Sequence, residues 1–306
     1  MKLELNTLKF FGIFLVINSH LDLHYPNTYF ATGGALGNFF FFLTSSIAIY
    51  FSLNNKLISF KEWYFKRFKR IYPKLFIILI ILISIGFIQI NNIKEIFFKF
   101  LFPKEYWFLP AIMIFYIPVF FIIKNMNILK LTLTIMLLTY ILFYFFLIDK
   151  NSYSIENNIL FKCFFYFSVM LIGIFFAHNY NKINFKIFWS LLIFFISFLS
   201  YYFLKYFMLI SEIYYLQILE HVFILIIVTS LLAIFKNDLM LDLLNKKKIK
   251  YSIGLISGIT LEMYLIHLYF SQNPFFSFPI NIILMFAIVI ILSIMMKKIF
   301  SFIKIH

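Results

Sequence analysis

Apolar residues recur along the chain in runs of about twenty, and short polar segments separate these runs. A helix of about twenty residues crosses the roughly 30 Å of a bilayer's hydrocarbon core. Because no water satisfies the backbone there, each run predicts a transmembrane α-helix. The pattern therefore predicts an all-α, polytopic membrane bundle of about ten spans, at residues 8–24, 34–53, 71–90, 107–123, 129–148, 158–177, 186–203, 214–235, 253–271 and 278–297.

The chain shows no sign of division into domains. No Gly/Ser-rich linker, low-complexity tract or internal repeat interrupts it, and it ends soon after the last expected span. We therefore expect residues 1–306 to form a single transmembrane domain with no appended soluble domain. The amino terminus, "MKLELNTLKFFGIFLVINSH", has an apolar core without a small-residue cleavage site, which predicts a retained first span.

Composition agrees with a membrane protein, since 63% of the residues are hydrophobic and only 13% are charged. The abundance of Phe, Ile, Lys and Asn is typical of AT-rich bacterial genomes, so we expect a bacterial cytoplasmic (inner) membrane. A net charge of +15 is also found in nucleic-acid-binding proteins, but here the basic residues lie between the apolar runs. This placement argues against a nucleic-acid partner. The single cysteine, Cys163, excludes an intrachain disulfide.

The basic residues also predict the orientation of the bundle. Segments on one side hold most of the 27 Lys+Arg, including the stretch "FKRFKR" at 65–70. Because cytoplasmic loops are enriched in Lys and Arg, this side and both termini are expected in the cytoplasm. Lys162 lies inside a span, and the lysines on the opposite side are Lys94, Lys99, Lys104, Lys150 and Lys205.

An ionisable side chain inside a membrane costs roughly 2.5–3.5 kcal/mol on insertion scales, so each one requires an explanation. A buried, hydrogen-bonded contact explains the adjacent Glu220 and His221. No His/Cys/Asp cluster has metal-ligand spacing, and no glycine-rich phosphate loop is present, so we expect no metal site. The candidates inside expected spans are His20, Lys162, Glu220, His221, Glu262 and His267.

His20 is expected in the outer half of the first span. Lys9 precedes it by eleven residues, which at about 100° per residue returns to nearly the same helix face, roughly 16 Å away along the axis. Two roles are open for His20: a functional imidazole deep in the bundle, or an interfacial histidine that marks the end of the span with Asp22 and His24.

Arg67 and Arg70 are the only arginines in the chain. Residues three apart share a helix face, so two guanidinium groups can hold phosphate oxygens there in a bidentate manner, which lysine does poorly. The alternative is a basic loop at the lipid headgroups, but lysine meets that need and serves it elsewhere in this chain. The choice of arginine favours an anionic ligand.

A stripe of polar residues lies within "GLISGITLEMYLIHLYF", residues 254–270. Helical spacing puts Ser257, Thr260, Tyr264 and His267 on one face, with Glu262 on roughly the opposite face. Interhelical hydrogen bonding explains the stripe, but a carboxylate near mid-membrane must be protonated or paired. Upstream, the Tyr106–Trp107 pair is typical of an aromatic belt.

In order, these segments resemble the membrane-bound acyltransferase family 3, whose members move acyl groups, often acetyl, from coenzyme A to sugar hydroxyls. Lys9 and His20 are similar to the family's arginine, ten residues and a histidine, with lysine replacing the arginine. "GNFFFFLTSS" is similar to a Phe-rich stretch ending in Ser-Gly, at Ser45 and Ser46, without the glycine. "RFKRIYP", "YWFL" and "TLEMYLIH" resemble the family's Arg-x-x-Arg element ending in Ile-Tyr-Pro, its Trp-Phe-Leu element and its Ser-Leu-Glu-x-Tyr-Leu-x-His element.

The resemblance implies an O-acetyltransferase that uses acetyl-CoA, or another acyl-CoA, as donor. Arg67, Arg70 and Lys9 would bind the donor at the cytoplasmic side. His20 would act as general base on the acceptor hydroxyl or carry the acyl group transiently. Glu262, assigned as its catalytic partner, or a hydroxyl of the stripe, would orient the imidazole.

The resemblance also implies a glycan acceptor at the cell surface or linked to a lipid, with Trp107, Tyr264 and His267 as substrate-binding residues. A separate extracytoplasmic protein that accepts the acyl group is a further candidate partner, beside the lipid bilayer. Two other functions stay open at this point. A transporter or flippase of lipid-linked glycans or polysaccharide also needs polar residues in the membrane, and a structural subunit would tolerate their substitution.

Overall fold

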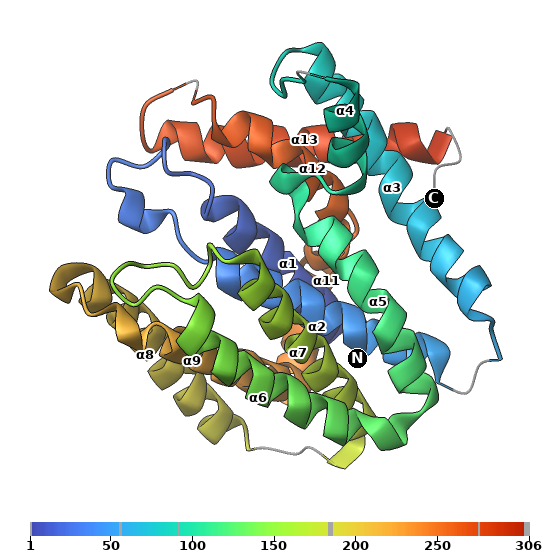
Figure 1. Cartoon of the computed structure of the whole chain (residues 1–306), viewed down its shortest axis with the longest axis vertical. Coiled ribbons are helices and arrows are strands. Elements are labelled where there is room, and N and C mark those ends of the chain that lie inside the picture. The colour runs from blue at the N-terminus through green and yellow to red at the C-terminus, as the bar shows by residue number, and fades with distance from the viewer. Residues whose placement is uncertain (1, 55–56, 91, 183–185, 275, 303–306) are drawn as a thin grey trace. The chain divides into compact units, whose positions relative to one another are not determined.

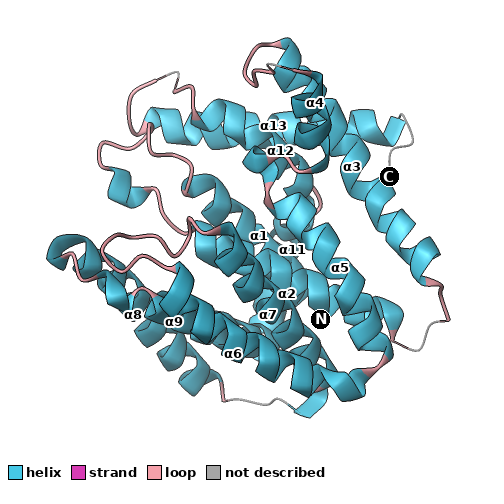
Figure 2. Cartoon of the chain, viewed as in Figure 1, coloured by secondary structure: helices cyan, strands magenta, loops and turns pink. Residues whose placement is uncertain are grey.

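The structure is a computed structural model that describes residues 2–54, 57–90, 92–182, 186–274 and 276–302. Within these ranges the chain is helical, with connecting loops and no strand (Figure 2). The all-α class predicted from the apolar runs is therefore confirmed. All the candidate site residues named above lie in the described ranges.

Figure 1 labels most of the helices that follow one another along the chain. Short 3₁₀ turns precede or follow several of them, among which Lys104–Tyr106 and Tyr214–Leu216 lead into membrane helices. The α-helices are α1 (Lys2–Asn18), α2 (Gly34–Leu53), α3 (Phe60–Ser84), α4 (Ile93–Leu101), α5 (Phe108–Lys124), α6 (Leu129–Leu147), α7 (Ile159–His178), α8 (Ile187–Ser211), α9 (Ile218–Lys236), α10 (Asp238–Asn245), α11 (Lys247–Ser257), α12 (Thr260–Ser271) and α13 (Ile280–Phe302).

Among the described residues, six helical segments are long and apolar enough to cross a membrane, and the number is eight if each of two bent helix pairs forms one span. The protein is therefore a multi-pass membrane protein. Each of the ten expected spans overlaps a helix, but not every one of these helices is long and apolar enough to be a candidate span. The segments at 8–24 and 71–90 are not among the candidates. The first holds only the 17-residue α1, and α3 combines an apolar half with the charged stretch 65–70.

The span expected at 253–271 is not one continuous helix. It is divided between α11 and α12, whose axes differ by 66°. The break falls at Gly258, directly after the last residue of α11, and its backbone N–H donates to the carbonyls of Gly254 and Leu255. Glycine at this point lowers the cost of leaving the helical conformation, which the apolar pattern by itself did not indicate.

The described chain forms two compact units built from interleaved segments. The first unit contains residues 1–8, 39–54 and 121–251. In it, α8 packs along α9, and α6 packs along α7. Gly173 of α7 lies where a Cβ would meet the carbonyl oxygen of Leu43 at 3.0 Å, so glycine permits close packing of α7 on α2.

The second unit contains residues 9–38, 55–120 and 252–306. Its core includes α12, which packs against α13 and α3. A second close approach occurs here, because a Cβ on Gly37 would lie 2.7 Å from the carbonyl oxygen of Gly12. The candidate site residues Lys9, His20, Arg67, Arg70, Trp107, Glu262, Tyr264 and His267 all belong to this unit. The expected single domain stays a prediction.

Candidate active site

Helix α12 provides one wall of the site. Its residues 262–268 are all buried, which means that both the face with the polar stripe and the face with Glu262 are packed. A helix buried all round occupies the interior of a bundle rather than its lipid-facing surface. The structure thus answers the question that the sequence left open, since α12 is central within its unit.

His20 and His267 lie side by side. Their ring centroids are 5.1 Å apart and the ring planes are inclined by 51°. The His20 side chain is exposed, whereas His267 is fully buried. The ring Nδ1 of His267 lies 2.7 Å from the carbonyl oxygen of Tyr264, to which it must donate because a carbonyl only accepts.

This bond leaves Nε2 of His267 as the unprotonated nitrogen, and it has no hydrogen-bond partner among the described atoms. A lone pair in a dry environment is a strong acceptor for a nearby N–H group. The described atoms show no hydrogen bond between the two rings, so this lone pair of His267 is available to accept one from His20. An accessible imidazole beside a buried one is an arrangement suited to general-base catalysis.

His20 does not sit inside a helix as expected. Helix α1 ends at Asn18, and His20 lies in the turn that follows, where its N–H donates to the carbonyl of Ile17. The side chain of Asn18 donates to the carbonyls of Phe30 and Thr32, which joins the end of α1 to the segment that follows. The expectation that Lys9 and His20 share one continuous helical wall was therefore wrong, because the helix ends before His20.

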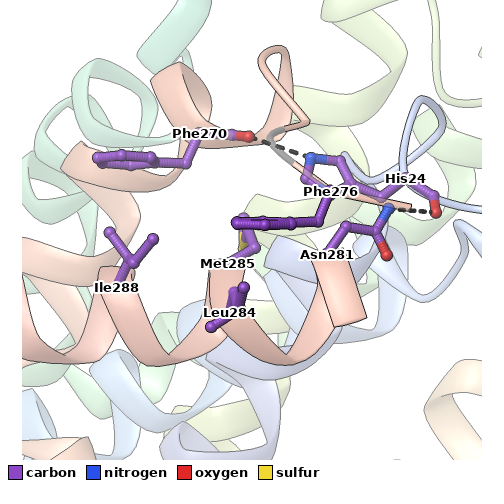
Figure 3. Close-up of a pocket in the computed structure, with 7 residues that line it drawn as sticks. All are labelled: His24, Phe270, Phe276, Asn281, Leu284, Met285 and Ile288. Atoms are coloured by element: carbon purple, nitrogen blue, oxygen red, sulfur yellow. Dashed lines mark hydrogen bonds between the residues drawn. The ribbon is translucent and has the colours of Figure 1, made fainter. Parts of the chain in front are cut away.

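The turn with His20 is attached to α12 and α13 through His24 (Figure 3). Nε2 of His24 donates to the carbonyl of Phe270 at 3.1 Å, and the amide of Asn281 donates to the His24 carbonyl at 2.7 Å. These residues line a small cavity of about 60 Å³, whose other walls are apolar: Phe276, Leu284, Met285 and Ile288.

Glu262 forms an ion pair with Lys74 of α3 at 2.7 Å. The two side chains are only 3% and 12% exposed, so the expected partner of this carboxylate is found. His267, five residues further along α12, is the residue that lies beside His20. The catalytic role expected for Glu262 stays a prediction, while its ion pair gives it a position between two helices.

Aromatic residues pack around Tyr264. The rings of Tyr106 and Phe108 lie 5.8 and 5.7 Å from it, and the Tyr106 hydroxyl donates to the carbonyl of Leu265 at 2.6 Å. Trp107, which lies between Tyr106 and Phe108 in the sequence, is half-buried. The segment 106–108 is thus joined to α12, and Tyr106 has a structural role beyond an aromatic belt.

The two arginines lie in the charged half of α3. Arg67 is half-buried and its guanidinium carbon is 5.6 Å from the centre of the Trp63 ring, whereas Arg70 is exposed. Burial lowers the pKa of Arg67 from its usual value, and the charge of Arg70 adds to the decrease, yet arginine stays protonated. Lys9 of α1 is close enough to interact electrostatically with both.

Three cations that repel one another at one place favour an anionic ligand there. The sequence predicted Lys9, Arg67 and Arg70 as such a group, and the structure brings them together. It did not predict the roles of Lys74, Tyr106, His24 and Asn281. The only feature of the sequence that drew attention to Lys74 was its position beside Pro73. No feature of the sequence indicated a role for Asn281, because its partner is 257 residues away.

Glu220 and His221 belong to the other unit, where both are buried. His221 contacts Tyr140 at 2.7 Å and Glu156 at 3.1 Å, and Glu220 accepts from the hydroxyl of Tyr153 at 2.8 Å. The hydrogen-bonded contact that the sequence analysis favoured for this pair is confirmed.

Comparison with known proteins assigns the chain to a family. The family model of the acyltransferase domain, acyltransferase family 3, matches residues 2–297. Because this match covers nearly the whole chain, the protein belongs to acyltransferase family 3. No curated protein and no solved structure matches it. The protein is therefore an acyltransferase with several membrane-spanning helices.

Proposed function

We propose that this chain transfers an acetyl group from acetyl-CoA to a hydroxyl of a cell-surface or lipid-linked glycan, in the cytoplasmic (inner) membrane of a bacterium. The observation that carries the proposal is the pair of imidazoles, with His20 exposed and His267 buried 5.1 Å away. Membership of acyltransferase family 3 supports acyl transfer in general. The donor, the acceptor and the residue roles are part of the proposal.

Donor binding is assigned to the cation cluster of Lys9, Arg67 and Arg70. The guanidinium groups hold the phosphate groups of coenzyme A through charge-assisted, forked hydrogen bonds. The distribution of lysine and arginine supports a cytoplasmic position for this end of the protein, where acetyl-CoA is supplied. The long pantetheine arm then extends toward His20.

In the chemical step, His20 takes the proton from the acceptor hydroxyl while the hydroxyl oxygen attacks the thioester carbonyl. The carbon–sulfur bond breaks, and coenzyme A leaves as a thiolate that takes up a proton. His267 accepts a hydrogen bond from one ring nitrogen of His20 and so leaves the other nitrogen unprotonated. In a two-step variant, this nitrogen attacks the thioester and carries the acetyl group before the acceptor arrives.

Acceptor binding is assigned to the aromatic groups beside α12. Trp107 is half-buried and offers a flat apolar surface of the kind that sugar rings require, while Tyr264 and His267, both buried on α12, are assigned from the resemblance. The acceptor is either the glycan itself or a separate extracytoplasmic protein that passes the acetyl group on.

Acetyl-CoA binding and thioester hydrolysis by protein purified in nanodiscs test the proposal. For His20→Ala we expect binding within about twofold of wild type and hydrolysis reduced about a hundredfold, since the base is lost. For Arg67→Lys/Arg70→Lys we expect a Kd about tenfold higher, because lysine keeps the charge but not the forked geometry.

The control is Lys66→Gln/Lys69→Gln, which removes two charges from the same helix and keeps both arginines. If this variant weakens binding more than the arginine variant, net charge rather than guanidinium geometry holds the donor. A wild-type protein that binds no acyl-CoA but moves a lipid-linked glycan across vesicles would be a transporter, contrary to the proposal.

A further inference from the structure

The segment between α1 and α2, residues 19–33, carries His20 but is not helical over most of its length. Such a segment has more conformational freedom than a helix, so an exposed catalytic group on it needs external support. No hydrogen bond joins the His20 ring to the His267 ring in the part of the chain that the structure describes. The distance between the rings must therefore be set by other contacts of the segment.

His24 provides two of these contacts, one through its side chain and one through its backbone. Its Nε2 donates to the carbonyl of Phe270, in the last turn of α12, which also accepts from the backbone N–H groups of Gln272 and Asn273. Its own carbonyl accepts from the amide of Asn281, in the first turn of α13. Figure 3 shows both bonds meeting at His24, so one residue is attached to two helices.

The bond from Asn281 to His24 is buried, and the bond from His24 to Phe270 is partly buried. His24 and Asn281 are only 3% and 5% exposed, and the cavity beside them is lined by apolar side chains. A hydrogen bond shielded from water is stronger than an exposed one, and a buried polar group left without its partner is costly. Loss of either bond is therefore expected to release this part of the segment.

The spacing connects these bonds to the imidazole pair. His24 follows His20 by four residues, and Phe270 follows His267 by three. The bond between His24 and Phe270 therefore joins the same two chain segments that present the two imidazoles, about one turn away. Asn281 also accepts from the N–H of Ile282 through its side-chain oxygen, which fixes the orientation of its amide.

We propose that His24 and Asn281 are positioning residues, which hold residues 19–33 against α12 and so set His20 beside His267. The inference rests on the proposed role of His20 in acyl transfer. His24 takes no part in the chemistry itself, because its Nε2 is bonded to Phe270 and the residue is buried. Its effect on the reaction passes entirely through the placement of His20.

The kinetic test compares variants that differ only in the bonds they make. His24→Leu removes the side-chain bond, whereas His24→Gln keeps an amide nitrogen near the place of Nε2. Asn281→Asp keeps the acceptor for Ile282 and loses the donor to His24. The matched control is Asn273→Asp, because the side-chain amide of Asn273 donates to the carbonyl of Tyr269, four residues away, and not to His24.

We expect His24→Leu and Asn281→Asp to lower kcat for acetyl-CoA hydrolysis about tenfold or more, with KM for acetyl-CoA within twofold of wild type. His24→Gln should recover most of kcat, and Asn273→Asp should retain the wild-type value. Unchanged kcat in both main variants, or no recovery with His24→Gln, would overturn the proposal.

A cross-linking experiment measures the same placement without any activity. In a Cys163→Ala chain, His20→Cys and His267→Cys should be joined by a short bis-methanethiosulfonate cross-linker, because the imidazole rings that they replace have centroids 5.1 Å apart. Adding His24→Leu or Asn281→Asp should slow this cross-link about fivefold or more, while Asn273→Asp should not. If the wild-type protein has no acyl-CoA activity but the cross-link is still slowed by these substitutions, the positioning role is supported and the proposed function is rejected. Equal cross-linking rates in all chains would reject the positioning role alone.

Discussion

The ion pair between Lys74 and Glu262 is the single-residue feature with the clearest energetic consequence. Both side chains are nearly buried, and their atoms are 2.7 Å apart. Lys66 and Glu62, on the charged half of α3, form a pair of similar length at 2.6 Å, but these two side chains are 66% and 57% exposed. Two pairs with the same geometry therefore differ mainly in their access to water.

Removal of one partner is expected to act very differently in the two pairs. Glu262→Gln leaves the ammonium of Lys74 buried without its counter-charge, which should lower the free energy of unfolding by about 3 kcal/mol. Glu62→Gln should lower it by about 1 kcal/mol or less, because water screens the exposed pair. Thermal unfolding in detergent measures both changes, and equal losses would contradict this account.

Variants of the same pair can distinguish a role of Glu262 in stability from a role in catalysis. Replacing both partners with apolar residues, as in Lys74→Met/Glu262→Met, should restore most of the stability that Glu262→Gln loses. If Glu262 also has the catalytic role expected from the sequence, this stable double variant will still hydrolyse acetyl-CoA much more slowly than wild type. Near wild-type hydrolysis would assign Glu262 a structural role alone.

Glycine residues permit close packing between helices at particular points in this protein. In the first unit, Gly173 lies against α2, where a Cβ would meet the carbonyl oxygen of Leu43 at 3.0 Å and crowd the Ser46 hydroxyl. The hydroxyl can rotate, but the carbonyl belongs to the backbone of α2. Small residues at such positions allow close approach of membrane helices, whose association relies on packing rather than on the hydrophobic effect.

Gly173→Ala is therefore expected to destabilise the protein by about 1–3 kcal/mol, because α7 or α2 must shift. Gly254→Ala is the matched control, since Gly254 also lies within a helix, α11, but a Cβ there would meet nothing within 4 Å. At that position alanine should be neutral or stabilise by up to about 1 kcal/mol through its higher helix propensity. Similar effects of the two substitutions would show that close packing at Gly173 is unimportant.

The orientation of the whole chain in the membrane follows from its charge. Lysines and arginines are concentrated in segments such as 65–70 and 246–250, and are sparse in 148–158. This asymmetry is the basis for expecting both termini, and the cation cluster of Lys9, Arg67 and Arg70, in the cytoplasm. Donor access from the cytoplasm depends on this orientation.

Single cysteines in a Cys163→Ala chain test the orientation. Asn151 and Lys248 are both exposed and lie on opposite sides of the expected membrane. In intact cells, Asn151→Cys should react with a membrane-impermeant maleimide, and Lys248→Cys should react only after permeabilisation. The reverse pattern would place the cation cluster outside and remove the basis for cytoplasmic donor binding.

The sequence by itself determined the all-helical class, the positions of most membrane helices and the group of candidate residues. These properties depend on local information, because hydropathy and charge are read within a window of about twenty residues. The helices α2, α6 and α7 therefore begin and end within a residue of the expected spans. Hydropathy did not indicate the ends of α1 at Asn18 and of α11 before Gly258, because both ends lie inside apolar runs.

Only the tertiary structure decided which candidates lie together. Lys74 meets Glu262 from 188 residues away, Asn281 meets His24 from 257 residues away, and the buried imidazole beside His20 is that of His267. Periodicity shows which face of a helix is polar, but not which distant segment packs against that face. The pairing depends on how the helices pack within the unit, and this packing is a property of the whole fold.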